Sequence, residues 1–502
     1  MNPQAILDAL AAHGVVARRL CADSRRVQPG DIFVALRGAR VDGRAFIADA
    51  LARGAAAVVA EDGTPPNYSG GDTAPGAKRA PIVVVKGLAH RVGGLADVVY
   101  GHPSAQLWLA GVTGTNGKTS VTQWIAQAMG RLGTPCAVIG TLGSGLPGEL
   151  AESPNTTPDA VAVHETLAGF VARGLPACAM EVSSIGIAQG RVCAARFAVA
   201  AFTNLTRDHL DYHGDMATYA EAKARLFAWP ALPAAVINVD DAFGRTLALG
   251  LPRAVEGFAC ALDAASIPAA WRGRTLLARE LDFSAGGVAF KVDEVRFASP
   301  VVGRFNVANL LVVIGVLRAH GHALGDIAGA LTHLAPPPGR MQALGGANEP
   351  LVVVDYAHTP DALEQVLGSL RETARARGGR LHCVFGCGGD RDPGKRPLMG
   401  AIAERLADVS WVTSDNPRSE PPQAIIDQIV AGMTAGAERV VDAERGAAIM
   451  RAIGAAAADD VVLLAGKGHE PYQEIAGVRH AFSDKDVAAR ALAVRRATEV
   501  AT

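Results

Sequence analysis

The chain has 502 residues, a formal net charge of −1 and 7 scattered cysteines, and this length predicts roughly three domains of about 150 residues each. The near-neutral charge, without a run of lysine or arginine, excludes a nucleic-acid surface, and the odd number of cysteines excludes a disulfide framework. No stretch approaches the roughly 18 apolar residues of a membrane span and no secretion signal opens the chain, so we expect a cytoplasmic monomer that acts on small molecules without membrane insertion.

The first predicted domain, residues 1–104, is a small α/β domain. It has a helical pattern at residues 6–13 and three short apolar runs that are typical of strands. Those runs are residues 32–36, 55–60 and 82–85. Residues 63–80 are rich in Pro, Gly, Ser and Thr, which predicts an exposed loop. Gly101-His-Pro-Ser104 predicts a linker to the next domain.

A glycine-rich turn, Gly111-Val-Thr-Gly-Thr-Asn-Gly-Lys-Thr-Ser120, organises the middle of the chain. An apolar run at residues 107–112 precedes it. Residues 121–132 follow with apolar side chains at helical spacing. The order is therefore strand, phosphate loop and helix, and a glycine turn with an incidental surface lysine is the weaker alternative.

The loop residues suit a nucleotide with a magnesium ion. Gly114 and Gly117 let backbone N–H groups close around phosphate oxygens, while the helix N-terminus adds its positive dipole end. Lys118 can reach the outer phosphates and Thr119 can ligate Mg²⁺. Val112 occupies the first glycine position of the usual motif, so the loop is a variant. The expected ATP contacts here are Gly114, Thr115, Asn116, Gly117, Lys118, Thr119 and Ser120.

The middle domain, residues 105–335, is predicted to hold a parallel sheet buried on both faces. Its further strands are expected at residues 136–139, 177–180, 198–203 and 234–239. Polar residues follow two of these strands, at Glu181–Ser184 and Asn204–Asp208. Ligands of open α/β sheets bind beyond the carboxyl ends of the strands, so we expect a site at the edge that carries the phosphate loop.

The last predicted domain, residues 336–502, begins at the proline run Pro336-Pro-Pro-Gly-Arg340. Four buried strands are expected at residues 351–354, 382–385, 409–412 and 461–464. Polar or glycine residues follow each of them. These residues would gather on one edge of a second sheet, which predicts a separate site in this domain.

Thr119, Glu181 and His209 are candidate magnesium ligands because strand ends offer them to one crevice, although Glu181 could cap a helix and His209 could be structural. Lys223 falls on an apolar helical stripe with Tyr219. A lysine is rarely buried without a partner. From the residues alone, the alternative that the ammonium group reaches water is favoured.

Several motifs, spread in order between Asp23 and Glu470, resemble the Mur ligase family. They are Gly114-Thr-Asn-Gly-Lys-Thr-Ser120, Asn155-Thr-Thr157, Glu181-Val-Ser-Ser184, Asn204-Leu-Thr-Arg-Asp-His-Leu-Asp-Tyr-His213, Asp415-Asn-Pro-Arg418 and Gly466-Lys-Gly-His-Glu470. The resemblance is strongest to the members that add meso-2,6-diaminopimelate to UDP-N-acetylmuramoyl-L-alanyl-D-glutamate in peptidoglycan precursor synthesis. It implies an ATP-dependent amide-forming ligase that works through an acyl phosphate. It also implies a P-loop-type central sheet flanked by a small α/β domain and a Rossmann-like C-terminal domain.

The resemblance also implies roles for individual residues. A carbamate formed from CO₂ on Lys223 would join Thr119, Glu181 and His209 around Mg²⁺, with Lys118 as a further catalytic residue. The remaining ATP contacts would be Asn306, Arg340 and Asp355. The UDP-substrate contacts would be Ser24, Asn155, Thr156, Thr157, Ser183, Gln189 and Arg191. The diaminopimelate contacts would be Arg391, Asp415, Asn416, Pro417, Arg418, Gly466 and Glu470.

Two positions depart from the family pattern. Ile185 stands where a histidine is usual, and Ala39-Arg-Val41 is not the usual motif, so the resemblance implies no contact near Arg40. Asp415 and Asn416 are also typical of a plain turn. The same is true of Asp23, the residue before Ser24. An L-lysine-adding Mur ligase, a folylpolyglutamate synthetase-like ligase and a nucleotide-binding regulatory module without turnover are the alternative functions.

Overall fold

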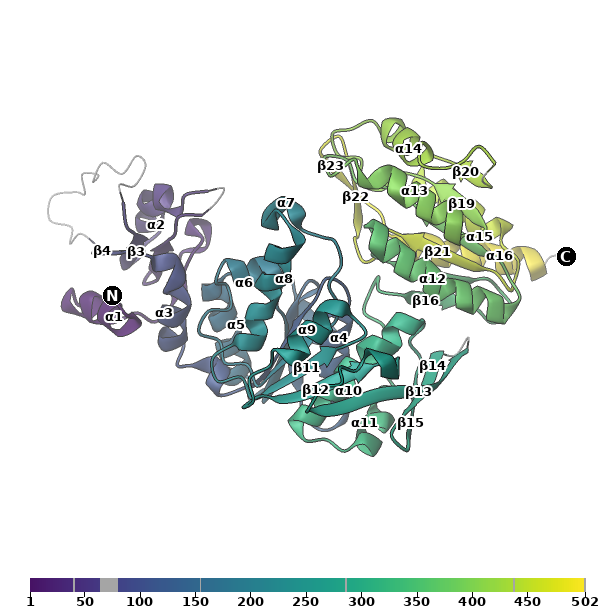
Figure 1. The fold of residues 1–502 in the computed structure, drawn as a ribbon. Helices are drawn as coiled ribbons and strands as arrows, with labels where there is room; N and C mark the ends of the chain where they lie inside the picture. Colours follow the sequence, from purple (N-terminus) through teal and green to yellow (C-terminus); the bar gives the residue numbers. More distant parts are fainter. Residues whose placement is uncertain (39–40, 64–79, 154, 285–286, 437, 501–502) are drawn as a thin grey trace.

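The computed structural model describes residues 1–38, 41–63, 80–153, 155–284, 287–436 and 438–500. Arg40 and residues 64–79 of the expected loop lie outside the described residues. The chain forms three α/β lobes that follow one another along the sequence, with the middle lobe between the other two (Figure 1). Each lobe is built on a sheet of its own.

The N-terminal lobe holds a four-stranded parallel sheet in the order β1-β2-β3-β4. The three apolar runs expected here form β2, β3 and β4. The elements of this lobe are α1 (Pro3–Ala12), β1 (Leu20–Cys21), η1 (Ser24–Arg26), β2 (Ile32–Ala35), η2 (Gly43–Phe46), α2 (Ile47–Ala52), β3 (Ala57–Glu61), β4 (Ile82–Val85), η3 (Leu88–His90), α3 (Val92–Val99) and η4 (Pro103–Ala105). Ile6 and Leu10 of α1 are fully buried in its core.

The middle lobe contains a mixed sheet of eleven strands, in the order β15-β14-β13-β12-β11-β10-β5-β9-β6-β7-β8. Its elements up to β10 are β5 (Trp108–Thr113), α4 (Lys118–Arg131), β6 (Cys136–Gly140), β7 (Gly143–Leu146), β8 (Glu149–Ala151), α5 (Ala160–Ala172), β9 (Ala177–Glu181), α6 (Ser184–Ala188) and β10 (Val199–Phe202). The later elements are α7 (Leu210–His213), α8 (Met216–Ala224), η5 (Arg225–Ala228), β11 (Ala234–Asn238), α9 (Ala242–Leu249), β12 (Glu256–Ala261), η6 (Ala264–Ser266), β13 (Arg274–Ser284), β14 (Gly287–Val292), β15 (Val295–Ser299), α10 (Arg304–His320) and α11 (Leu324–Leu331).

The central strands β12, β11, β10, β5, β9 and β6 run parallel. This was expected from the continuous apolar sequences of all of them except β12, which was not predicted. Helices α4 and α10 cover one face of this part of the sheet, and α5 and α9 cover the other. The antiparallel hairpins at both edges were not predicted. Their sequences alternate polar and apolar residues or contain glycine, so they lack the continuous apolar run that marks a buried strand.

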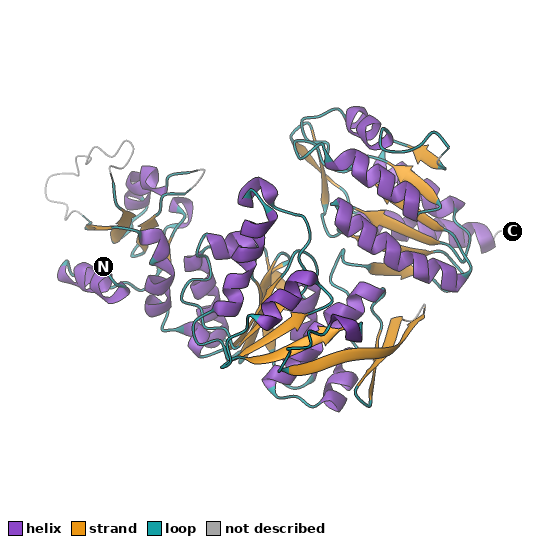
Figure 2. Cartoon of the chain, in the orientation of Figure 1, coloured by secondary structure: helices purple, strands orange, loops and turns teal. Residues whose placement is uncertain are grey.

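The C-terminal lobe holds a six-stranded sheet in the order β16-β17-β21-β18-β19-β20, in which only β16 is antiparallel. Its elements up to α14 are β16 (Gln342–Gly345), β17 (Leu351–Asp355), α12 (Pro360–Arg377), β18 (Leu381–Phe385), α13 (Lys395–Leu406), β19 (Val409–Val412) and α14 (Pro422–Val430). The remaining elements are β20 (Arg439–Val441), α15 (Arg445–Ala455), β21 (Val461–Ala465), the hairpin β22 (Tyr472–Ile475) and β23 (Val478–Ala481), and α16 (Asp484–Val500). Helices lie on both faces of this sheet (Figure 2).

The connection between the middle and C-terminal lobes is hydrogen-bonded to α4 at Ala335. Trp124 Nε1 and Gln127 Nε2, both on α4, donate to the Ala335 oxygen at 3.0 and 3.1 Å. Ala335 N donates back to Gln127 Oε1 at 2.9 Å. A second contact lies further along, where Ser369 Oγ of α12 accepts a hydrogen bond from Arg304 N at the start of α10 (2.9 Å). Within the described residues, no helix has both the length and the hydrophobicity to cross a bilayer.

Candidate active site

Two glycines shape the phosphate loop between β5 and α4. Gly114 has a φ of +150° and Gly117 a φ of +83°, conformations that residues with a side chain rarely adopt. A Cβ at Gly114 would collide with Thr203 Oγ1, and one at Gly117 would lie 2.5 Å from Asn309 Oδ1. No side chain caps the N-terminus of α4, which leaves its first N–H groups for an anion.

The polar end of β10 holds this loop in place. Thr203 Oγ1 donates to the Asn116 oxygen at 2.6 Å, and Asn204 Oδ1 accepts from Asn116 N at 2.9 Å. Thr115 N donates to the Asn204 oxygen at 2.8 Å. On the other side, Thr115 Oγ1 lies 3.0 Å from the hydroxyl of Tyr219 on α8. The loop is therefore preorganised by side chains from two other elements before any ligand arrives.

Two lysine side chains converge on one backbone oxygen of the loop. Lys118 Nζ donates to the Gly114 oxygen at 2.8 Å, and Lys223 Nζ donates to the same oxygen at 2.8 Å. Lys223 is 1% exposed, so the alternative that its ammonium group reaches water is wrong. Burial lowers the pKa of both amines, and the Lys118 ammonium group further lowers the pKa of Lys223, which lies well below its usual value.

Thr119 and Glu181, two of the predicted magnesium ligands, are in contact. Thr119 Oγ1 donates to Glu181 Oε2 at 3.0 Å. Adjacent ligands of an octahedral Mg²⁺ at about 2.0–2.1 Å lie about 2.9 Å apart, so this pair of oxygens fits such an ion. Glu181 is 1% exposed. Thr141 fixes its orientation by donating from N at 2.8 Å and from Oγ1 at 3.1 Å.

His209, another predicted ligand, stands apart from this pair. It precedes α7 with a φ of +52°, its side chain is 45% exposed, and its Nε2 lies 3.6 Å from Asp208 Oδ2. No contact among the described residues joins it to Thr119 or Glu181. In the described part of the chain, no three His, Cys, Asp or Glu side chains are grouped to hold a cation. A magnesium ion bound by Glu181 would therefore need oxygen ligands of other kinds, such as the Thr119 hydroxyl, phosphate oxygens or carbamate oxygens.

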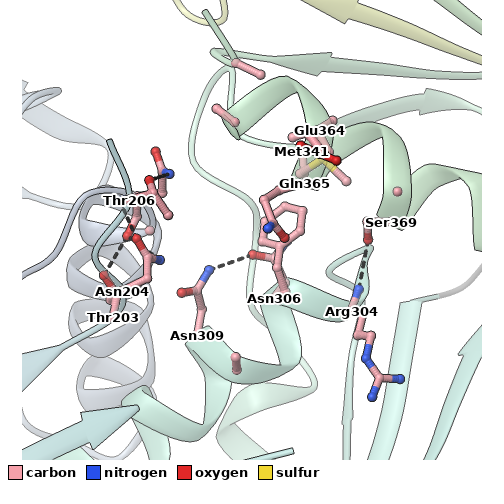
Figure 3. Close-up of a pocket in the computed structure, with 18 of the residues that line it drawn as sticks. Thr203, Asn204, Thr206, Arg304, Asn306, Asn309, Met341, Glu364, Gln365 and Ser369 are labelled. Carbon is pink, nitrogen blue, oxygen red and sulfur yellow. Dashed lines mark hydrogen bonds between the residues drawn. The ribbon is translucent and has the colours of Figure 1, made fainter. Parts of the chain in front are cut away.

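A cavity of about 710 Å³ lies between the phosphate loop and the C-terminal lobe. The predicted ATP contacts Asn116, Gly117, Ser120, Asn306, Arg340 and Asp355 line it. Figure 3 shows its two walls, with Thr203 and Asn204 on one side and Asn306 and Asn309 nearer the C-terminal lobe. Asn309 Nδ2 donates to Asn306 Oδ1 at 3.1 Å. The cavity thus adjoins the phosphate loop and is wide enough for a nucleoside.

Arg340 and Asp355 line the cavity on the side of the C-terminal lobe. The Arg340 guanidinium carbon lies 4.7 Å from the centroid of the Tyr356 ring, and its buried Nε has no hydrogen-bond partner within the described chain. Asp355 accepts from Met341 N and Ala357 N, each at 2.8 Å. Burial raises the pKa of this carboxyl group. Arg340 therefore presents a buried donor that has no partner in the described chain.

Four of the residues predicted to bind the muramoyl dipeptide are joined to one another. Thr157 Oγ1 donates to Ser183 Oγ at 3.0 Å, and Arg191 Nη1 donates to the Thr157 oxygen at 2.7 Å. Arg191 also donates to Gln189 Oε1 from Nε at 2.9 Å and from Nη2 at 2.7 Å. This group adjoins the magnesium pair, because Thr157 Oγ1 also lies 2.9 Å from the backbone carbonyl oxygen of Glu181.

The other predicted dipeptide contacts are more scattered. Thr156 Oγ1 lies 3.1 Å from Thr141 Oγ1, while Asn155 is exposed. Ser24 lies in the N-terminal lobe, is 6% exposed, and its hydroxyl hydrogen bond lowers the pKa of Asp49. No contact among the described residues links Ser24 to the other dipeptide residues. Ile185 is partly buried in α6.

The residues predicted to bind diaminopimelate gather at the carboxyl ends of β19 and β21. Asp415 is 6% and Asn416 4% exposed. Gly466 has a φ of +113°, and a Cβ there would lie 2.7 Å from Asp415 Oδ2. Asn416 Nδ2 donates to Glu470 Oε2 at 2.8 Å. Lys467, which the sequence reasoning did not select, is buried among them and donates to the same Glu470 oxygen at 3.0 Å.

Arg418 has a fixed backbone at the edge of this group. Its φ is +52°, its N donates to the Glu474 oxygen at 3.0 Å, and its oxygen accepts from Ala476 N at 2.7 Å. The hairpin β22–β23 therefore holds the residue in a left-handed conformation. Arg418 Nη1 donates to the Gly389 oxygen at 2.6 Å. The other predicted guanidinium group, that of Arg391, belongs to an exposed residue.

Three family models match the chain: the Mur ligase middle domain over residues 112–317, the Mur ligase glutamate ligase domain over residues 339–468, and the Mur ligase family catalytic domain over residues 17–100. The chain belongs to the Mur ligase family. This confirms the resemblance and the three-domain α/β fold inferred from the sequence, and it makes the protein a ligase.

A relative of this Mur ligase in Pseudomonas aeruginosa is named UDP-N-acetylmuramoyl-L-alanyl-D-glutamate–2,6-diaminopimelate ligase, and the two are 53% identical over 96% of each chain. A solved structure with the same name is 36% identical, with a TM-score of 0.67 over 96% of each chain. The folylpolyglutamate synthase of Mycobacterium tuberculosis is 17% identical, with a TM-score of 0.57 over 74% of this chain and 91% of its own. That last likeness shows a shared fold alone.

Sequence reasoning missed two residues that organise the sites of this Mur ligase. Thr141 orients Glu181, and its position directly after the strand β6 was the available signal. Lys467 stands between two glycines directly after β21. Its flanking motif was noticed, but the side chain itself was not, because its partner Asn416 lies 51 positions away in the sequence.

Proposed function

We propose that this Mur ligase uses ATP to join the D-glutamyl γ-carboxylate of UDP-N-acetylmuramoyl-L-alanyl-D-glutamate to an amino group of meso-2,6-diaminopimelate. The observation that carries the proposal is the arrangement of two sites in separate lobes. A phosphate loop opens on the 710 Å³ cavity, and a buried cluster with an arginine beside it lies in the C-terminal lobe. The name and the 53% identity of the Pseudomonas aeruginosa relative support the same substrates.

The chemistry divides into two steps. The γ-carboxylate attacks the γ-phosphorus of ATP, which gives an acyl phosphate and ADP, and the amine then displaces phosphate to form the amide. Phosphoryl transfer depends mainly on positioning and charge neutralisation, which the loop N–H groups and Lys118 supply. Mg²⁺, when bound near Thr119 and Glu181, would neutralise phosphate charge. We further propose that Asn306, Arg340 and Asp355 hold the nucleoside, and that the C-terminal lobe excludes water from the acyl phosphate.

Lys223 is proposed to carry a carbamate. A neutral amine attacks CO₂, forming a C–N bond and releasing one proton, so the group changes from a potential cation to an anion. Three observations support this: the nearly complete burial of Lys223, its lowered pKa, and its shared oxygen with the Lys118 ammonium group. An anion there would offset the positive charge of Lys118 and supply oxygen ligands beside Glu181 and His209 for Mg²⁺.

We assign the acceptor substrate to the joined residues Thr157, Ser183, Gln189 and Arg191, with Asn155, Thr156 and Ser24 as further contacts. The distal carboxylate of diaminopimelate is assigned to Arg418, whose planar donors fit a carboxylate. Arg391, Asp415, Asn416, Pro417, Gly466 and Glu470 would hold the rest of the amino acid. Domain boundaries at 104/105 and 335/336, a monomeric state and a cytoplasmic location stay predictions.

The test is amino-acid-dependent ADP formation with the UDP-dipeptide as acceptor. Diaminopimelate should support turnover. The rate with L-lysine, which lacks one carboxylate, should be lower by about 10⁴- to 10⁵-fold, because the polar groups of the site that pair with this carboxylate would be left without a partner. Equal rates with both amino acids would favour the lysine-adding alternative. ATP binding without substrate-stimulated turnover would favour the regulatory module.

A further inference from the structure

A fully buried ammonium group lies at the centre of the proposed amino-acid site. Lys467 is 0% exposed, and its Nζ donates to Asn416 Oδ1 at 2.9 Å and to Glu470 Oε2 at 3.0 Å. It also lies 3.7 Å from Asp415 Oδ1. Since Asn416 Nδ2 donates to the same Glu470 oxygen at 2.8 Å, both hydrogen bonds to this carboxylate fall on Oε2. Glu470 Oε1 accepts none from the described chain.

The lysine fixes the orientation of the Asn416 amide. Asn416 Oδ1 accepts from Lys467 Nζ and from Glu474 N, each at 2.9 Å. An ammonium group can only donate, so a flipped amide would place two donors against each other. The unflipped amide in turn directs its own donor at Glu470. Lys467 therefore sets the direction of the Glu470 carboxylate both directly and through Asn416.

The cluster also has an unbalanced charge. Asp415 and Glu470 are carboxylates and Lys467 is the one ammonium group among them, which leaves a formal charge of −1. A neighbouring pair, Arg445 and Asp484, is internally balanced at 2.7 Å, with both side chains 0% exposed. The Asp415 and Glu470 side chains are 9% and 19% exposed, and an excess negative charge that is largely withdrawn from water is costly unless a cation pairs with it. An ammonium group of an incoming amino acid meets that requirement.

We propose that Lys467 is a positioning residue for the incoming amino acid. It holds Glu470 with Oε1 free to accept from the substrate ammonium group, and it reduces the charge of the cluster to the single negative charge that one ammonium group balances. This rests on the proposed function, which assigns Glu470 to the amino acid. Lys467 does not touch the reacting atoms, so it acts on amino-acid binding and leaves acyl phosphate formation alone.

The test is the steady-state rate of ADP formation by Lys467→Met with each substrate varied in turn. The KM for diaminopimelate should rise about 100-fold, because removing one partner of a hydrogen-bonded charge pair at a binding site weakens binding by about this factor or more. The kcat at saturation and the KM values for ATP and the UDP-dipeptide should stay near wild type. The double variant Lys467→Met with Asp415→Asn restores the cluster charge to −1. It keeps the test valid if the single variant does not fold. Because Asp415 is itself an assigned diaminopimelate contact, Asp415→Asn is measured alone beside it, and the KM of the double variant should exceed that of Asp415→Asn because the orienting hydrogen bonds of Lys467 are absent.

Lys485→Met, a change at an exposed lysine of the same lobe, is the matched control and should behave as wild type. A wild-type KM for diaminopimelate in the folded variants would overturn the proposal, as would an equal rise in the KM values of all three substrates. Wild-type protein without diaminopimelate-dependent turnover would instead refute the proposed function, so the two failures are distinguishable.

Discussion

Replacing Lys223 by alanine tests the charge state of the phosphate-loop site. Lys118 Nζ and Lys223 Nζ each lie 2.8 Å from the Gly114 oxygen, so the two nitrogens can be at most twice that distance apart. Two ammonium groups at that separation repel each other by about 3 kcal/mol at an effective dielectric constant of about 20. This repulsion lowers the pKa of Lys223, in addition to the larger effect of burial. Lys223 is therefore poorly suited to remain an ammonium group beside Lys118.

If Lys223 carries a carbamate, Lys223→Ala removes an anion beside Lys118 and the phosphate loop. We expect the rate of phosphoryl transfer to fall by about 10²- to 10³-fold, the usual loss for one preorganised electrostatic group. Acetate or formate should restore part of the rate, because a small carboxylate can occupy the vacated position. The measurement is ADP formation with and without the added carboxylate, with Lys291→Ala as the control, since this lysine pairs with Glu280 on the far hairpin.

Three results would refute this reasoning. The first is a wild-type rate in Lys223→Ala. The second is a loss of activity that no small carboxylate reverses while the folded structure is intact. The third is the absence of a carbamate signal in the ¹³C spectrum of enzyme equilibrated with labelled bicarbonate. In the last case the repulsion would have to be relieved by a neutral amine at Lys223.

Other expected outcomes concern separate parts of the chain. Gly114→Ala should raise the KM for ATP and cost about 1–3 kcal/mol of stability, because φ is +150° and the new Cβ meets Thr203; thermal unfolding and ATP titration measure this. Lys118→Ala should lower phosphate release by about 10²- to 10³-fold, and near-normal turnover would remove the loop from the mechanism. Arg418→Ala should reduce diaminopimelate turnover far more than residual turnover with L-lysine, and an equal loss with both would contradict its role.

The remaining outcome concerns pH. Arg396 holds the pKa of Glu420 at about 2, below its usual 4.5. A lowered folded-state pKa adds stability above pH 4.5 that is lost as the pH falls towards 2. Urea unfolding of Arg396→Met should therefore differ from wild type at pH 7 and converge with it below pH 4.5, whereas a difference independent of pH would contradict this origin.

The sequence mainly predicted the strands that consist of consecutive buried apolar residues. The strand Cys136–Gly140 and its parallel neighbours are continuous apolar runs and were found. The strand Arg274–Ser284 was not, because charged residues such as Arg279, Glu280 and Asp282 interrupt its apolar residues. The phosphate loop was found because its glycines, lysine and following helix are contiguous.

The contacts that decide the chemistry could not be predicted in this way, because they join distant residues. The helical stripe placed Lys223 on an apolar face, but its ammonium group is held by an oxygen 109 positions away. Lys467 is bound to a residue 51 positions away. Neither separation leaves a periodic pattern in the sequence, so burial of these lysines is a result of the tertiary fold.

The hydrogen bonds between α4 and Ala335 would limit how the C-terminal lobe can rotate relative to the middle lobe. Trp124 and Gln127 belong to the helix that begins at the phosphate loop, so the connection is anchored to the same helix as the loop. Prolines 336–338 follow, and their fixed φ angles make this stretch stiff. A pivot would therefore fall just beyond them, where Gly339 has a φ of +63° and Met341 a φ of +47°.

Arg340 lies within this pivot, so rotation of the lobe would displace its backbone very little. Arg418 follows β19, four strand positions from β16 across the sheet, which is roughly 19 Å at the usual strand spacing. With the sites proposed above, the lobe would act as a lever whose nucleotide contact lies at the fulcrum and whose amino-acid site lies on the long arm. Under that proposal, rotation would leave the geometry of ATP nearly constant while it carried the amino acid towards or away from the acyl phosphate.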